Sequence, residues 1–356
     1  MSDMIAPPNQ NDPRSGLADW LELQALSSPR GISSGSTLLN IIDVLGDDAA
    51  FPLPADQETG EPLDESILGE RESQLVDIAF EELEYRNSVL GASYPFEVEM
   101  SRSRLSLKQS VISSHPGQIV YIFCLLASAT RESRLRLGKE LKDRIGNTFQ
   151  VCACLAAGGY LRGEVSSFGF PRRTGTDFLP ALRETYQRFG VGTIHNQGNI
   201  PEGLPDSLKD GGIDIIAWLD HPDKMPGKLY LLGQCASGAN WRSKSVLEYI
   251  EQLHGSWFVS QPAKHHSPAM FIPFLTHYDL DEPRNVPFLE KLKNAIQHEE
   301  RRFGMIFDRL RIAHFSDICM RFDPQMREKI DGTDRLDEVK AWVKTTCDNA
   351  GMAILV

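Results

Sequence analysis

The chain has 356 residues, of which 41% are hydrophobic and 24% are charged, a composition typical of a soluble globular protein. Its formal net charge of −12 argues against a protein that coats nucleic acid, because that binding is driven by Lys and Arg contacts to phosphates. A local basic groove is still compatible with this charge. The longest apolar run, residues 119–127, is too short to cross a bilayer, and the polar N-terminus lacks the features of a signal peptide. We therefore expect a cytoplasmic protein without a membrane segment.

The length indicates two domains or one elaborated domain. We expect residues 1–14 to be a disordered tail, residues 15–165 to form a mostly helical α+β region, and residues 166–356 to form an α/β domain. The six cysteines lie mostly in apolar stretches and include no Cys-x-x-Cys pair, so we interpret them as reduced core residues.

In the N-terminal region, apolar spacing predicts helices over residues 15–26 and 70–89, then a strand over 94–100 with a hairpin partner near 105–107. The segment 43–72 between the two helices is strongly acidic, with Arg71 as its one basic residue. Two interpretations of this segment stand. It is a solvated loop, or it mimics DNA and shields a basic site on the same protein.

A buried helix is expected over residues 118–127, and a basic segment follows it. That segment is either a solvated helix face or a face that contacts phosphates. Its Arg and Lys residues are Arg131, Arg134, Arg136, Lys139, Lys142 and Arg144. A further buried helix is expected over residues 147–161.

The second half of the chain alternates helices and strands. A loop over residues 169–175 carries Arg172 and Arg173, and a helix follows over 176–189. After a predicted hairpin, we expect helices over 241–253, 287–302 and 334–349, with strands over 269–274 and 304–307 between them. This order predicts an α/β layer arrangement around a central mixed sheet.

The hairpin spans residues 209–244, in which two apolar runs flank a turn-rich linker. If the linker is centred near Lys224, Leu219 is opposite Leu229, and Asp214 is opposite Gln234. Directly opposed residues share one face of a sheet, so we expect the Asp214 carboxylate and the Gln234 amide to converge, with Ala236 on the same face.

Asp214 at the start of one strand and Gln234 on the next resemble the PD-(D/E)xK, or restriction-endonuclease-like, superfamily and its Mrr-like branch, whose second motif is Gln-x-Lys. The resemblance covers roughly residues 175–275. It implies a restriction-endonuclease-like core in which the Asp and the Gln hold a divalent metal and a Lys positions the attacking water. The residue in the Lys position is Ala236, and Lys244 at the start of the next helix is the best replacement.

The resemblance implies a Mg²⁺- or Mn²⁺-dependent nuclease that cleaves DNA in a bacterial restriction or anti-phage defence system. Asp214 and Gln234 would bind the metal with the carbonyl of Cys235, Lys244 would act on the water or the phosphate, and a helix Glu would complete the site. Our candidate for that Glu is Glu184, for which a surface salt bridge to Arg188 is the alternative. Arg172, Arg173, Arg131, Arg134 and Lys139 are the candidate DNA contacts.

A second hypothesis is a catalytically inactive nuclease-fold subunit that binds DNA or scaffolds a defence complex. The absence of Lys at position 236 favours it. In either case we expect DNA as a partner, together with a second protein of a defence complex or another copy of the chain.

Overall fold

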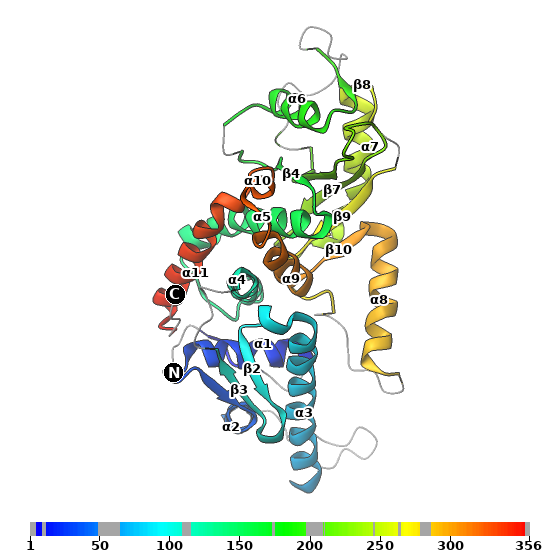
Figure 1. The fold of residues 1–356 in the computed structure, drawn as a ribbon. Coiled ribbons are helices and arrows are strands. Elements are labelled where there is room, and N and C mark those ends of the chain that lie inside the picture. Colours follow the sequence, from blue (N-terminus) through cyan, green and yellow to red (C-terminus); the bar gives the residue numbers. More distant parts are fainter. Residues whose placement is uncertain are drawn as a thin grey trace.

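A computed structural model shows an α/β protein built on one mixed five-stranded sheet (Figure 1). The structure describes residues 5–8, 12–48, 65–108, 115–172, 175–196, 209, 211–244, 246–262, 265–277 and 286–352, and for residues 43–48 and 65–72 it describes the backbone alone.

The strand order in the central sheet is β10-β9-β7-β6-β4. The strands β4 (Glu164–Ser167), β6 (Ile215–Leu219) and β7 (Leu229–Cys235) form an antiparallel meander. Helix α7 (Val246–Trp257) then leads to β9 (Ser267–Phe271), which pairs parallel to β7. Helix α8 (Phe288–Phe303) leads in turn to β10 (Met305–Phe307), parallel to β9.

Side chains alternate along each strand, so successive residues point to opposite faces of the sheet. Each face packs against a different set of helices. Ile215, Ala217 and Leu231 belong to a core shared with α5 (Lys139–Leu161) and α9 (Arg309–Met320). Ile216, Trp218 and Leu232 belong to a second core with α6 (Phe178–Phe189) and α7. We call these the α5 face and the α6 face.

Helix α4 (Pro116–Arg131) packs beside α5 and α9, and α11 (Leu336–Ala350) packs against α4 and α5. The short α10 (Pro324–Arg327) and the 3-10 turn η4 (Thr333–Arg335) lie between α9 and α11. A two-stranded sheet of β5 (Thr193–Ile194) and β8 (Phe258–Ser260) packs beside α6 and α7. No helix in the described part of the chain is long and apolar enough to cross a membrane.

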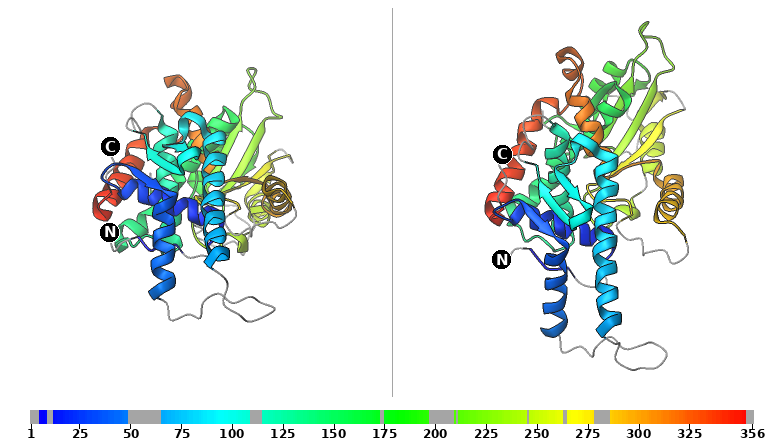
Figure 2. Two further views of the ribbon diagram at one scale, coloured as in Figure 1. Left: turned by 90° about the horizontal axis from the view of Figure 1, so that it is seen from below. Right: turned by 60° about the horizontal axis from the view of Figure 1, so that its bottom comes forward.

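A further layer is formed by the N-terminal elements. It contains α1 (Arg14–Ser27), α2 (Gly35–Asp48), α3 (Glu65–Leu90) and the sheet β1-β3-β2, made of Ile32–Ser34, Arg104–Leu107 and Phe96–Glu99. Figure 2 shows α2 and α3 side by side, projecting from the body of the protein. The predicted acidic loop over residues 43–72 is helical at both ends, since α2 continues to Asp48 and α3 begins at Glu65. Residues 49–64 lie outside the described residues, so both interpretations of the acidic segment stay untested.

A fully buried network of charges joins this layer to the rest of the protein. Arg309 on α9 donates to both oxygens of Asp19 on α1, at 2.7 and 2.8 Å. Arg86 on α3 donates to Asp19 at 2.7 Å and to Glu82 at 2.9 Å. Burial alone raises the pKa of Asp19, but the charges of Arg309 and Arg86 outweigh it and bring this pKa to about 2. Asp19 is therefore ionised in a site without exposure to water.

Glu22 is the second acceptor of this network. The hydroxyls of Tyr94 and Tyr121 donate to it at 2.6 and 2.7 Å, and Arg86 lies 3.0 Å from it. His277, which follows β9, contacts Glu82 at 2.9 Å. The network thus links α1, α3, α4 and α9 to the segment that follows β9 of the central sheet. We call it the ion network.

The predicted boundary between residues 165 and 166 falls inside β4, and one continuous core runs from Leu17 to Met352. The packing therefore shows no division at that point. In the tail, which we predict to be disordered, Ile5 forms a bridge with Leu135, and Arg14 already lies in α1 and is buried. The cysteines are unpaired, as we expect.

Candidate functional site

The hairpin forms with the predicted register, because Leu219 pairs with Leu229 and Ile215 with Gly233. Asp214 lies just outside β6, where the regular pairing ends. Before it, Gly211 and Gly212 have φ angles of +62° and +79°, a conformation that favours glycine. A Cβ on Gly212 would also stand 2.4 Å from the ring of Tyr249. The two glycines set the path by which the chain enters at Asp214.

Because the pairing of β6 with β7 ends at Ile215, the Asp214 side chain does not follow the alternation of the strand. Its Oδ2 accepts a hydrogen bond from the backbone N–H of Cys235 at 2.7 Å. Its backbone N–H donates to the carbonyl of Gly233 at 2.8 Å, and its carbonyl accepts from the N–H of Phe168 at 2.7 Å. The side chain therefore continues the ladder between β6 and β7 instead of projecting with the residues of the α6 face.

The second oxygen of Asp214 points into a space that Gly169 leaves open at the end of β4. A Cβ on Gly169 would stand 2.5 Å from Oδ1 of Asp214 and 2.7 Å from Oε1 of Gln150. Gln150 belongs to α5, and its amide nitrogen donates to Ser167 at 2.8 Å, which leaves the amide oxygen beside the carboxylate. We call the space over Gly169, between these two oxygens, the Gly169 cradle. Neither Gln150 nor Gly169 is part of the motif that the sequence presents, so reasoning from that motif misses both.

Gln234 projects from the opposite face, with Leu232 and Ala236, so the predicted convergence of Asp214 and Gln234 is wrong. The physical reason is the break in alternation at the start of β6, where Ile213 packs into the α6-face core and Asp214 turns toward α5. Gln234 is 5% exposed, and among the described residues its Oε1 has no hydrogen-bond partner.

Cys235 lies beside Asp214, and its thiol is influenced by the charges of both Asp214 and Lys244. Burial raises the pKa of the Cys235 thiol, the Asp214 carboxylate raises it further, and the Lys244 ammonium opposes that rise. The two charges therefore act on the same thiol. Lys244 follows the turn η3 (Trp241–Ser243), whose Trp241 packs on Phe303 with ring centroids 5.0 Å apart. This packing fixes the turn that directly precedes Lys244.

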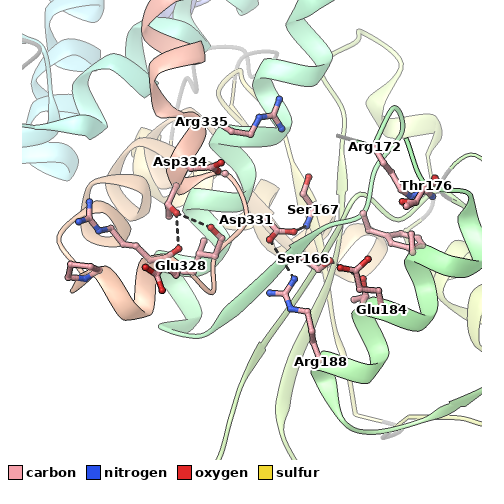
Figure 3. A pocket seen from close by; sticks show the side chains of 18 residues that line it. Ser166, Ser167, Arg172, Thr176, Glu184, Arg188, Glu328, Asp331, Asp334 and Arg335 are labelled. Atoms are coloured by element: carbon pink, nitrogen blue, oxygen red, sulfur yellow. Dashed lines mark hydrogen bonds and ion pairs between the residues drawn. The ribbon is translucent and has the colours of Figure 1, made fainter. Parts of the chain in front are cut away.

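Glu184 lies elsewhere, on the exposed side of α6. It lines a pocket of about 860 Å³ along the outer edge of β4, and Asp214 is not a lining residue. Figure 3 shows Glu184 and Arg188 on α6 across from Asp331. Arg188 forms an ion pair with Asp331 at 3.5 Å, and Asp331 accepts from the N–H of Ser167 at 2.8 Å. The structure thus does not bring Glu184 to Asp214, and the predicted partner of Arg188 is replaced by Asp331.

The five candidate DNA contacts have different surroundings. Arg134 is 7% exposed and pairs with Asp12 at 2.9 Å. Arg131 lies 3.8 Å above the ring of Phe274 and pairs with Glu132. Both guanidinium groups are thus engaged in contacts within the fold and present little surface to a phosphate. Lys139 is exposed and pairs with Asp143 at 2.6 Å.

Arg172 is the candidate contact that lies near Asp214. Its guanidinium is 4.9 Å above the ring of Phe168 and donates to the carbonyl of Thr176 at 3.3 Å. Phe168 is the residue whose N–H donates to the Asp214 carbonyl. Arg173 lies outside the described residues.

The donors at Asp214 fit a divalent ion only in part. Across the described ranges, no group of three or more His, Cys, Asp or Glu side chains is arranged to hold a metal. Mg²⁺, however, keeps several waters and binds through one or two carboxylates together with substrate phosphates. The Asp214 carboxylate is a ligand of this kind, and the Gln150 amide lies next to it over Gly169.

Two histidines form a separate buried group on the α6 face that the sequence does not reveal. His254 on α7 is 7% exposed, its Nε2 lies 3.3 Å from the hydroxyl of Tyr230, and its ring is 5.4 Å from that of His266. Burial, with His266 as a second cause, lowers the pKa of His254 from 6.5 to about 4. His266 is half-buried, whereas its neighbour His265 is exposed.

This pKa predicts a pH dependence of stability. Since the unfolded chain binds a proton at His254 more readily than the folded protein, the free energy of unfolding falls as pH falls from about 6.5 to about 4. Between pH 7 and pH 5, we expect the unmodified protein to lose about 2 kcal/mol of its free energy of unfolding through His254, after allowance for solvent screening. The variant His254→Asn should not show this part of the loss. Urea unfolding at pH 7 and pH 5 measures it, with His298→Asn on the exposed side of α8 as control. An unchanged pH dependence in His254→Asn contradicts the assignment.

No protein-family model, curated protein or solved structure matches this chain, so its function has to be argued from the geometry around Asp214.

Proposed function

We propose that the protein is a metal-dependent nuclease that hydrolyses phosphodiester bonds of DNA in a bacterial defence system, with Asp214 as its metal-binding carboxylate. The proposal is carried by one observation. Asp214 stands at the entry to the second strand of the β4–β6–β7 meander, hydrogen-bonded to Cys235, on whose thiol Lys244 also acts. The meander, followed by α7 and the parallel strand β9, is also the order of elements expected for a restriction-endonuclease-like core.

The residues around Asp214 have distinct roles in this proposal. The N–H of Cys235 fixes one oxygen of the carboxylate and leaves the other at the Gly169 cradle. When bound there, Mg²⁺ supplies a water of lowered pKa and neutralises charge on the phosphate. The Lys244 ammonium stabilises the negative charge that develops on the phosphoryl oxygens as the bond to water forms. Gln150 keeps its amide oxygen toward the same space through its hydrogen bond to Ser167.

A second candidate function is that of a catalytically inactive nuclease-fold subunit. Two observations favour it: Gln234 lies on the face away from Asp214, and no group of three or more His, Cys, Asp or Glu side chains among the described residues is arranged to hold a metal. In either function, a partner protein of a defence complex or a second copy of this chain completes the assembly that we propose.

The test of the first candidate is Lys244→Met. We expect it to lower the initial rate of Mg²⁺-dependent DNA cleavage by about 10²- to 10³-fold, since it removes one fixed group that stabilises charge in the transition state. Lys293→Met, which removes an exposed lysine of α8, is the matched control and should cleave at the rate of the unmodified protein. Equal rates in the two variants contradict a role for Lys244.

A further inference from the structure

We propose that Phe170, together with Lys209 and Arg172, forms a stacking site for a base of single-stranded nucleic acid beside Asp214. The inference deepens the proposed function, and it rests on that function for the meaning of its position next to a cleavage site. Its own evidence is the exposure of one aromatic ring and the charges gathered around it.

Phe170 is 50% exposed, whereas nearly all other aromatic rings described are buried or partly buried. Tyr160, 43% exposed, is the other exposed aromatic ring in the described ranges, and it packs edge-on against Phe307 and Phe315. The exposed part of an aromatic ring is a surface on which a base stacks, because each base has a π-face.

Two cations accompany the ring. The ammonium of Lys209 lies 5.7 Å from the centre of the Phe170 ring. The guanidinium of Arg172 donates to the backbone carbonyl of Lys209, which ties the two segments together. Binding sites for single strands combine this pair of features, a stacking ring for the base and positive charge for the backbone. A duplex would present its bases already stacked and paired, so the ring would gain little from it.

The same two segments hold Asp214. Residues 168–172 continue from β4, and the N–H groups of Phe168 and Gly169 both donate to the Asp214 carbonyl. Lys209 lies just before the glycine pair that leads into Asp214. A base stacked on Phe170 therefore lies on the segment that is hydrogen-bonded to Asp214. A protein with a net charge of −12 needs such a local site, because its overall field repels nucleic acid.

The test measures binding in EDTA, so that cleavage does not enter. Fluorescence anisotropy would give the Kd for labelled oligo-dT, oligo-rU and a DNA duplex of equal length, with the unmodified chain, Phe170→Leu, Phe170→Trp and Tyr160→Leu. We expect single strands to bind more tightly than duplex. Phe170→Leu, which keeps an apolar side chain but loses the ring, should weaken single-strand binding about tenfold. Phe170→Trp and Tyr160→Leu should bind as the unmodified chain does.

Comparing oligo-dT with oligo-rU distinguishes DNA from RNA. Weaker binding of either oligonucleotide by Phe170→Leu supports the site. Single-strand binding that is unchanged in Phe170→Leu, or duplex binding that falls equally, overturns it. The failure of this proposal is separable from that of the proposed function. Phe170-dependent binding without cleavage leaves the stacking site and removes the nuclease. If Phe170→Leu cleaves and binds as the unmodified chain does, the nuclease proposal stands and the stacking site is removed.

Discussion

Arg309→Met is expected to lower the free energy of unfolding by about 3–5 kcal/mol, because it leaves the Asp19 carboxylate buried without its main partner. Arg309 donates to both Asp19 oxygens, and neither residue is exposed to water. The remaining charge of Arg86 cannot replace the lost guanidinium, since it already serves Glu82 and Glu22. Methionine fills much of the volume, so the loss reports the charge and not a cavity.

Urea unfolding at pH 7 measures this prediction. The control is Arg301→Met on the exposed side of α8, for which we expect a change within about 0.5 kcal/mol. A loss below about 1 kcal/mol in Arg309→Met would mean that Asp19 takes up a proton or that water reaches it. The same network predicts acid sensitivity. Folding lowers the pKa of Asp19 and Glu82 to about 2, so the stability they contribute is present above their unfolded pKa and lost as pH falls toward 2.

The second large effect is expected for Asp214→Asn, which should lower the rate of metal-dependent cleavage by about 10³-fold or more. Asparagine still offers an oxygen to the N–H of Cys235, so the end of the hairpin keeps its 2.7 Å hydrogen bond. What disappears is the negative charge at the cradle. The initial rate of strand cleavage measures the effect, and thermal unfolding verifies that the variant is folded.

The control for Asp214→Asn is Asp348→Asn, which removes an exposed carboxylate near the end of α11. If both variants cleave at the rate of the unmodified protein, Asp214 is not the metal-binding carboxylate. If Asp214→Asn instead unfolds, the hydrogen bond to Cys235 is more sensitive to charge than the geometry indicates. The variant Gln150→Leu then tests the cradle without changing any ionisable group.

Much of the fold follows from local patterns. Helices near residues 15–26, 70–89, 118–127 and 287–302 form as α1, α3, α4 and α8, because apolar spacing and helix propensity agree there. The hairpin register also follows from the sequence, since the turn-rich linker fixes which residues face each other.

Other elements could not be predicted because their stability comes from distant partners. β4 has four residues, including two serines, and becomes a strand through pairing with β6. The helix α9 carries Arg309, whose buried charge is possible only because Asp19, almost three hundred residues earlier, lies beside it. A sequence shows the Arg but not the carboxylate that accepts it.

Only part of the candidate site could be predicted from the sequence. Asp214 stands just before β6 and Lys244 directly after η3, and the charges of both act on the Cys235 thiol. The joint role that the resemblance implies for these two residues stays a prediction. Gln234 does not join Asp214, since a register argument assumes that alternation continues through Asp214. The Gly169 cradle joins α5, β4 and the hairpin, so its residues are adjacent only after the sheet has formed.

The proposed nuclease activity is tested most directly by incubating the purified protein with supercoiled plasmid and single-stranded DNA, with Mg²⁺ or Mn²⁺ and with EDTA. We expect cleavage that requires the metal and is lost in Asp214→Asn. DNA binding without cleavage by the unmodified protein, with either metal and on either substrate, would contradict the nuclease and support the catalytically inactive subunit.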